Sequence, residues 1–446
     1  MDSATLLTRA ADMLVAAKKA GADAADALAI VSRDISASMR HGKPENIEQA
    51  ETSAVGLRVF VGQSSATLST SEFSAASLAT LAENAVAIAR VAPADPYATL
   101  ADAALLAHTI EPLEATDDFT PDMALLQAQA REIETAGLAT SGITNSGGAD
   151  ASMSAHQLAL VTSHGFAGSY ATTRYSLSVS LIAGQGDTMQ RDYDYATVTH
   201  HGDLPAPASI GQSAAERTLA RMHPRKVKSQ TATVYFDPRA GRQLLSAFAS
   251  AISGSAITRG TSFLKDALGK EIFGKNIRIT DDPRLKRGLA SRPFDAEGIA
   301  AKPFDFVTNG TLTSWLLDTR SANQLGLKTT GHASRGLAGA PHPSTSNFYL
   351  HNGTHSPAEL FAQLGDGFYV TETIGHGTNL ITGDFSLGAS GFWIEGGVRA
   401  FPVSEVTIAG NLRDMFAHLI PANDLQFRYG TNVPTLAIPT MTIAGN

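Results

Sequence analysis

The residue composition and the hydrophobic pattern of the sequence change near residue 228, and this change constrains the fold more than any other feature. Before it, alanine-rich stretches with helical spacing alternate with strand-like runs. After it, glycines and prolines recur every few residues and separate short runs that alternate as strands do. A chain of 446 residues is also too long for one ordinary hydrophobic core. We therefore expect two domains, residues 1–222 and 223–446, joined near a basic stretch at 221–228.

The first domain is predicted to be mixed α and β. An amphipathic N-terminal helix should end at Gly21, because glycine commonly follows the last helical residue. Strands are expected within residues 27–39, 54–61, 64–73 and 163–184, and helices at 74–91, 121–136 and 203–219.

The second domain is predicted to be β-rich, a barrel or a sandwich that carries one helix. We call it the framed helix, because a strand and a turn precede it and mark where it starts. Asn309-Gly310 is a strong hairpin signal between two strand-like runs. After a strand at 231–236, Asp237-Pro238 favours a turn and a helix start. The buried face of that helix should consist of the apolar residues at three-and-four spacing, Leu244, Leu245, Phe248 and Ile252.

The composition excludes several classes of protein. Only 17% of residues are charged and the net charge is −8, which argues against nucleic-acid binding. The N-terminus has no continuous apolar stretch, and no later segment stays apolar for the roughly 20 residues of a membrane helix. Cysteine is absent, which removes disulfides and thiolate ligands. We expect a soluble, cytoplasmic protein that partners neither nucleic acid nor membrane.

The familiar catalytic motifs are missing. The sequence contains no phosphate-binding loop, no G-x-S-x-G elbow and no His followed by Glu. His351 and His355 are four residues apart, a spacing that could chelate a metal on a helix. Asn352-Gly353 between them forms a turn, so a surface loop is favoured.

Two further pairs are weak candidates for chemistry. Ser262 and Lys265 have the spacing of a Ser–Lys nucleophile pair, but Ser262 fits a helix start better. Asp295 and Glu297 would share one face of a strand, as paired carboxylates do. Their position between a proline and a glycine favours a solvated turn instead.

A glycine-rich stretch at residues 375–397 gathers polar side chains, among them His376, Asn379 and Asp384. Glycine at this density lets backbone approach either a ligand or another strand. The stretch is therefore a cavity lining or a tightly wound loop. Trp393 and Glu395 share a strand face in it. We expect Trp393 to be largely buried, unless this face lines the cavity.

Ordered blocks along nearly the whole chain resemble the TldD/PmbA family of two-subunit metallopeptidases, once called modulators of DNA gyrase, and specifically its PmbA (TldE) branch. The blocks are GLRVFVGQSSATLSTSEFS (56–74), AIARVAPADPYATLAD (87–102), MQRDYDYATV (189–198), SRPFDAEGIA (291–300), TTGHASRG (329–336), TGDFSLGASGFWIEGG (382–397) and FPVSEVTIAGNLRDM (401–415).

The resemblance implies where a metal site would lie. In the TldD branch, the framed helix carries an HExxxH segment whose histidines bind metal and whose glutamate is the base. A cysteine near the C-terminus completes that site. With Leu244-Leu245 as the shared leucines, the resemblance places Ser246 and Ala251 at the histidines and Ala247 at the glutamate. Residues 242–265 contain no His, Glu, Asp or Cys, so no donors remain.

The resemblance thus implies a non-catalytic PmbA/TldE-type subunit with no metal of its own. A TldD-type partner would carry the metal, expected to be zinc, and the pair would degrade or mature unfolded or small peptides. Two alternatives stay open: a self-paired homodimer that binds peptides without cutting them, and an independent hydrolase that uses Ser262 and Lys265. Candidate residues for the cavity and peptide contact are Arg335, His376, Asn379, Asp384, Trp393 and Glu395.

Overall fold

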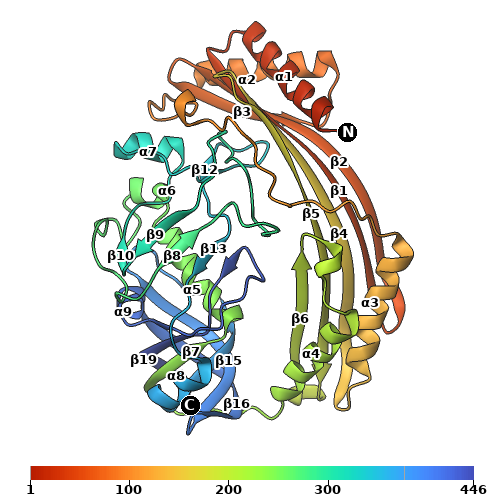
Figure 1. The fold of residues 1–446 in the computed structure, drawn as a ribbon, viewed down its shortest axis with the longest axis vertical. Coiled ribbons are helices and arrows are strands. Elements are labelled where there is room, and N and C mark those ends of the chain that lie inside the picture. Colours follow the sequence, from red (N-terminus) through yellow and green to blue (C-terminus); the bar gives the residue numbers. More distant parts are fainter. Residues whose placement is uncertain (1, 376, 446) are drawn as a thin grey trace.

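The computed structural model describes residues 2–375 and 377–445. Its N-terminal half is built on one long, curved antiparallel sheet with strand order β3-β2-β1-β4-β5-β6 (Figure 1). The strands are β1 (Ala24–Arg40), β2 (Lys43–Val61), β3 (Ser64–Thr70), β4 (Ile143–Thr162), β5 (Ala167–Ala183) and β6 (Gln190–Val198). The helices of this half are α1 (Ser3–Ala20), α2 (Ala75–Val91), α3 (Met123–Leu138) and α4 (Pro207–Ala220), with single 3-10 turns η1 (Ala103–Leu105), η2 (Gly186–Thr188) and η3 (His201–Asp203).

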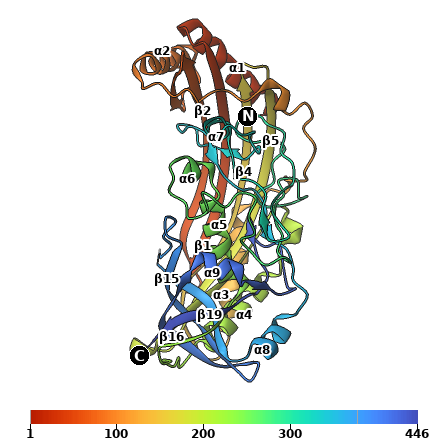
Figure 2. The same ribbon diagram turned by 90° about the vertical axis from the view of Figure 1, so that its left-hand side faces the viewer.

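Alternation along the strands separates the two faces of this sheet. One face of the sheet is covered by the helices: on β1, Ala27 and Ala29 pack under α1 and α2, and Ile35 and Ala37, further along the same face, pack under α3 and α4. The three alanines among these residues let the helices lie close to the strands. The opposite, concave face is turned toward the C-terminal half (Figure 1). Figure 2 shows the long strands running past that half from end to end.

The C-terminal half contains a closed five-stranded barrel. Its strands are β7 (Gln230–Phe236), β14 (Gly367–Ile374), β15 (Asp384–Glu395), β16 (Val398–Asn411) and β19 (Leu436–Ala444). The pairing of β16 with β19 closes the barrel, and β17 (Ile420–Pro421) adds to β19. Closure leaves no open edge among the five strands.

A smaller, five-stranded sheet with order β10-β9-β8-β13-β18 packs beside the barrel. It consists of β8 (Ile279–Asp281), β9 (Phe304–Thr308), β10 (Thr311–Leu312), β13 (Phe348–Leu350) and β18 (Thr431–Asn432). The remaining elements of this half are β11 (Ala333–Ser334), β12 (His342–Pro343), α5 (Pro238–Ala251), α6 (Gly254–Thr258), α7 (Thr319–Leu325), α8 (Pro357–Leu364) and α9 (Leu412–Ala417).

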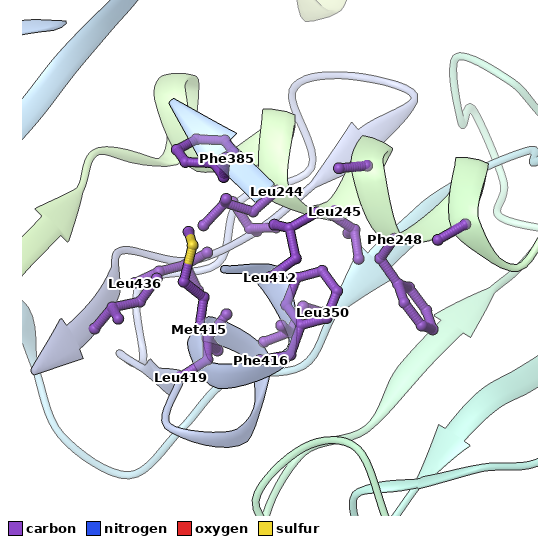
Figure 3. Packing of buried hydrophobic residues seen from close by; sticks show 14 of the residues in the cluster. Leu244, Leu245, Phe248, Leu350, Phe385, Leu412, Met415, Phe416, Leu419 and Leu436 are labelled. Carbon is purple, nitrogen blue, oxygen red and sulfur yellow. The ribbon is translucent and has the colours of Figure 1, made fainter. Parts of the chain in front are cut away.

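Helix α5 packs into the largest hydrophobic core of the protein, and Figure 3 shows its apolar side chains there. Leu244, Leu245, Phe248 and Ile252 are each no more than 3% exposed. The ring of Phe248 packs edge-on against Phe273 and Phe416. The predicted buried face of this helix is confirmed.

The two halves are held together by a buried contact on the concave face of the sheet. Leu28 and Leu160 pack against Phe294 and Ile299 from the C-terminal half. Beside them, Asp26 forms ion pairs with Arg58 of β2 and with Arg335 of the loop that follows β11. The three side chains are nearly inaccessible to solvent. Apolar burial and paired charge thus fix the C-terminal half against this end of the sheet.

The fold class predicted from the sequence is confirmed: a mixed α and β N-terminal half precedes a β-rich half that contains a barrel and the framed helix. The hairpin at Asn309-Gly310 joins β9 and β10. Within residues 2–375 and 377–445, no helix combines the length and the apolar character needed to cross a membrane.

Candidate functional site

Helix α5 is positioned by its first residues. The Asp237 carboxylate accepts a hydrogen bond from the Arg239 backbone N–H at 2.9 Å, and Pro238 occupies the first turn. The other carboxylate oxygen of Asp237 accepts the Tyr369 hydroxyl at 2.8 Å. Gly241 lies against Val433 and Leu436, where an added Cβ would have only 3.1–3.2 Å to its neighbours. The helix is therefore fixed in direction and in depth.

The residues present do not fit a metal ion. Ser246 is exposed on α5, and its neighbour Ala247 is 8% exposed, so the position aligned with a catalytic base carries a buried methyl group. Ala251, aligned with a second histidine, is fully buried. No group of three or more His, Cys, Asp and Glu side chains that could hold a metal occurs among the described residues. Serine and alanine side chains offer no credible donor set for zinc.

The open face of α5 borders two adjoining cavities. One, of about 440 Å³, lies along the C-terminal part of the helix and includes Ser246, Ser250 and Ser253. The other, of about 500 Å³, lies along its N-terminal part and reaches Tyr193 of β6. Both are lined by Ser246 and Thr431, so together they form one groove along the helix. We call this the α5 groove.

Arginines give the α5 groove a positive character. Arg239 donates to Asp192 at 2.9 Å and lies over the Tyr193 ring. Burial opposes its charge, but the hydrogen bond with Asp192 outweighs this and raises the pKa of Arg239. Arg242 lies 3.8 Å over the ring of Tyr429. The lining of the two cavities thus includes three arginines, Arg239, Arg242 and Arg259, and one carboxylate, Glu372, which pairs with Arg221.

The polar residues of the glycine-rich stretch mainly support their own loop. The Asn379 side chain accepts backbone N–H groups of Ile381 and Thr382. Asp384 is exposed and accepts the Thr382 hydroxyl at 2.7 Å and the Asn411 amide at 3.1 Å. These two candidates do not line the α5 groove, although their neighbour Leu380 does. The candidate His376 lies outside the described residues.

The other predicted contact residues lie elsewhere. Trp393 is half-buried and packs against the barrel core, where the β15 register shifts between Trp393 and Ile394. It is thus mostly enclosed, in agreement with the prediction, although it is not fully buried. Glu395 is exposed at the end of the same strand. The side chain of Arg335 is 1% exposed and is paired with Asp26. This burial disfavours peptide contact by Arg335, which stays a prediction.

The Ser–Lys pair does not form a nucleophile site. Ser262 is 2% exposed, and its hydroxyl donates to the Ala251 carbonyl at 2.6 Å while accepting the Leu264 N–H. Lys265 is exposed to solvent. His351 forms a hydrogen bond with the Thr280 hydroxyl at 2.8 Å, and His355 forms one with the Gln363 side chain. Both histidines lie in the loop between β13 and α8, not in a helix. The loop predicted for the two histidines is confirmed.

The prediction of a solvated turn for Asp295 and Glu297 is wrong, because the side chains are 1% and 2% exposed. Asp295 accepts three backbone N–H groups, and Glu297 accepts the N–H and hydroxyl of Thr319. Burial raises the pKa of Asp295, and burial together with the Asp295 charge raises the pKa of Glu297 to about 8. The apolar flanks Phe294 and Ile299 were the signal in the sequence that this segment is buried.

Comparison with known proteins gives the family. Three family models match in order: "PmbA/TldA metallopeptidase domain 1" at residues 25–89, the "central domain" at 111–222 and the "C-terminal domain" at 229–445. The fold and the α5 region thus define a chain built on a metallopeptidase scaffold.

Relatives and solved structures agree with these matches. The chain is 37% identical to "Metalloprotease PmbA" of Escherichia coli over 95% of this chain and 92% of that protein. It is 36% identical to "Metalloprotease PmbA homolog" of Haemophilus influenzae over 96% and 94%. A Bacteroides thetaiotaomicron structure, described as a candidate modulator of DNA gyrase, matches with a TM-score of 0.91 at 28% identity over 98% of both chains. TldE from Thermococcus kodakarensis has the same fold, with a TM-score of 0.86 at 18% identity over 98% and 100%. The chain belongs to the PmbA/TldD family of metallopeptidases.

Proposed function

We propose that this chain is the non-catalytic, PmbA/TldE-type subunit of a two-subunit metallopeptidase that degrades or matures unfolded peptides. The observation that carries the proposal is α5: a helix held firmly in place presents Ser246, Ala247 and Ala251 where the resemblance expects metal ligands and a base. A TldD-type partner supplies the metal, zinc, and this chain shapes the cavity in which the peptide lies.

The names of the relatives support a peptidase role, and a protein named TldE shares the fold. A protein named "Metalloprotease TldD homolog" also matches, at 22% identity over 46% of this chain. We place the complex in the cytoplasm, apart from membrane and nucleic acid. We also divide the chain into domains at 1–222 and 223–446, a division supported by family models that end at 222 and resume at 229.

The test is to measure metal and activity on the same preparations. Purified alone without a histidine tag, this chain should hold no stoichiometric zinc and hydrolyse no peptide. Mixed with a TldD-type partner, it should form a complex whose hydrolysis is abolished by chelator. The matched control is a partner with its metal ligands mutated. Activity that persists with that control, or one zinc per chain on this subunit alone after dialysis, would contradict the proposal.

One observation favours a second candidate, a self-paired peptide-binding homodimer. Residues 43–54 of β2 pair with β1 on one side, while β3 covers only Val55–Val61 on the other, in the part of the chain that the structure describes. A second copy could add to this edge. The test is the molar mass in solution, measured by light scattering on the chain alone and mixed with a TldD-type partner. A homodimer that the partner does not dissociate favours this candidate.

A hydrolase built on Ser262 and Lys265 is disfavoured by the buried Ser262 hydroxyl, which is committed to a backbone carbonyl. Peptide cleavage by the chain alone in excess chelator, lost on Ser262→Ala, would restore that candidate.

A further inference from the structure

The cavity along the C-terminal part of α5 is lined by hydroxyl groups, apolar side chains and one arginine. Its volume of about 440 Å³ falls in the range of small-ligand sites. No Asp or Glu lines it, and its one charged lining residue is Arg259. The ligand it suits is therefore polar along its length and anionic at one point.

Arg259 is available to such a ligand. It follows the short helix α6, is exposed to solvent, and its guanidinium has neither an ion pair nor a hydrogen bond among the described residues. Arg239, at the other end of the groove, is by contrast held by Asp192. An arginine that presents its planar donors to an open cavity can bind a carboxylate through two parallel hydrogen bonds.

The hydroxyl groups around Arg259 match a peptide backbone. The hydroxyls of Ser246, Ser253, Thr345 and Thr431 line the cavity and have no hydrogen-bond partner within residues 2–375 and 377–445. A hydroxyl both donates and accepts, so it can bond a peptide N–H or C=O whatever the neighbouring side chain is. Apolar side chains at the cavity wall offer contact to one side chain of the ligand; they are Ala249, Ala256, Leu316 and Leu380.

We propose that this cavity binds a short segment of the peptide substrate and anchors a carboxylate of that peptide on Arg259. The proposal rests on the proposed function for the nature of the ligand and extends it, because it gives this subunit a substrate-holding role of its own. The carboxylate can be the C-terminus of the peptide or an acidic side chain, and the experiment separates the two.

The experiment is fluorescence anisotropy at low salt with the purified chain alone. The probe is an N-terminally labelled Ala-Ala-Leu-Ala tetrapeptide, as the free acid and as the C-terminal amide. A second pair, Ala-Glu-Leu-Ala amide and Ala-Gln-Leu-Ala amide, tests the acidic side chain. Within at least one pair, the charged member should bind about tenfold more tightly, as expected for a charge-assisted hydrogen bond.

Three variants assign the site. Arg259→Gln should weaken only the charged peptide, so that the difference within the pair disappears. Lys265→Gln is the matched control, since Lys265 is an exposed cation nearby in the sequence that does not line the cavity, and the difference should persist. Ser250→Trp fills the cavity from an exposed position and should weaken all peptides, with an unchanged circular dichroism spectrum.

Equal binding within both pairs would overturn the proposal. So would a difference that survives Arg259→Gln, one that Lys265→Gln also removes, or full binding by Ser250→Trp. Because no hydrolysis and no partner are involved, these outcomes are separate from the test of the proposed function. A mixture that hydrolyses peptide while this chain shows no carboxylate preference would refute the inference alone.

Discussion

Gly56 of β2 is the point at which the N-terminal sheet and the C-terminal half come into direct backbone contact. An ideal Cβ built on Gly56 would lie 2.0 Å from the carbonyl oxygen of Leu337, whereas ordinary contact begins at 3.4 Å. A Gly56→Ala substitution must therefore push the backbone near Leu337 away by about 1.4 Å, the difference between these two distances. A flexible side chain could rotate away from the added methyl group, but the neighbouring atoms here belong to the backbone of Leu337 and can move only if the chain shifts.

The displaced segment carries Arg335, which is paired with Asp26 in the buried contact between the halves. Overpacking by itself costs about 1–3 kcal/mol. Weakening a buried ion pair costs up to about 3–5 kcal/mol, because a carboxylate is left without its partner. We therefore expect Gly56→Ala to lower the free energy of unfolding by about 3 kcal/mol.

The assay is urea unfolding followed by circular dichroism, together with trypsin cleavage mapped by mass spectrometry. The variant should be cut after Arg335, which is shielded in the wild type. Gly202→Ala is the matched control, since Gly202 has no neighbour within 4 Å of an added Cβ and its φ is not positive. If Gly56→Ala unfolds within about 0.5 kcal/mol of the control and Arg335 stays protected, the inferred contact is wrong.

Two further predictions concern the buried carboxylate and the buried face of α5. The pKa of Glu297 is raised from 4.5 to about 8, so its contribution to stability is complete below about pH 4.5 and is lost as the pH rises through about 8. In urea titrations across this range, the wild type should lose stability relative to Glu297→Gln, and parallel curves would contradict this. Phe248→Ala should cost about 3–5 kcal/mol, because the side chain is fully buried among aromatic rings. Ser250→Ala on the exposed face should change stability by less than about 0.5 kcal/mol, and equal effects would refute the assigned orientation of the helix.

Local patterns predicted the elements well, because each pattern depends on neighbours in the sequence. The spacing of Leu244, Leu245 and Phe248 predicted the orientation of α5, and Asn309-Gly310 predicted a hairpin, as found. The candidate site was harder to predict. Arg259 lacked any signal, since a single arginine after a short apolar run resembles any solvated surface cation.

The errors share one physical cause, which is burial by segments distant in the sequence. Asp295 and Glu297 have the local features of a solvated turn, yet the sheet and Thr319 cover them. The side chain of Arg335 is likewise enclosed, because it pairs with Asp26, 309 positions away in the sequence. Such pairings depend on which strands meet, and sequence spacing carries no information about that.

The sequence by itself determined the family of the chain, because the matching blocks lie along nearly its whole length. It also determined which side chains stand at Ser246, Ala247 and Ala251, none of which is a histidine, a carboxylate or a thiol. Only the tertiary structure decided which polar groups are free to act. Closure of the barrel and docking against the curved sheet bury Asp295, Glu297 and Arg335, and they leave the α5 groove open with Arg259 beside it. Solvent access and partner distance are properties of the packed chain, so no reading of neighbouring residues could supply them.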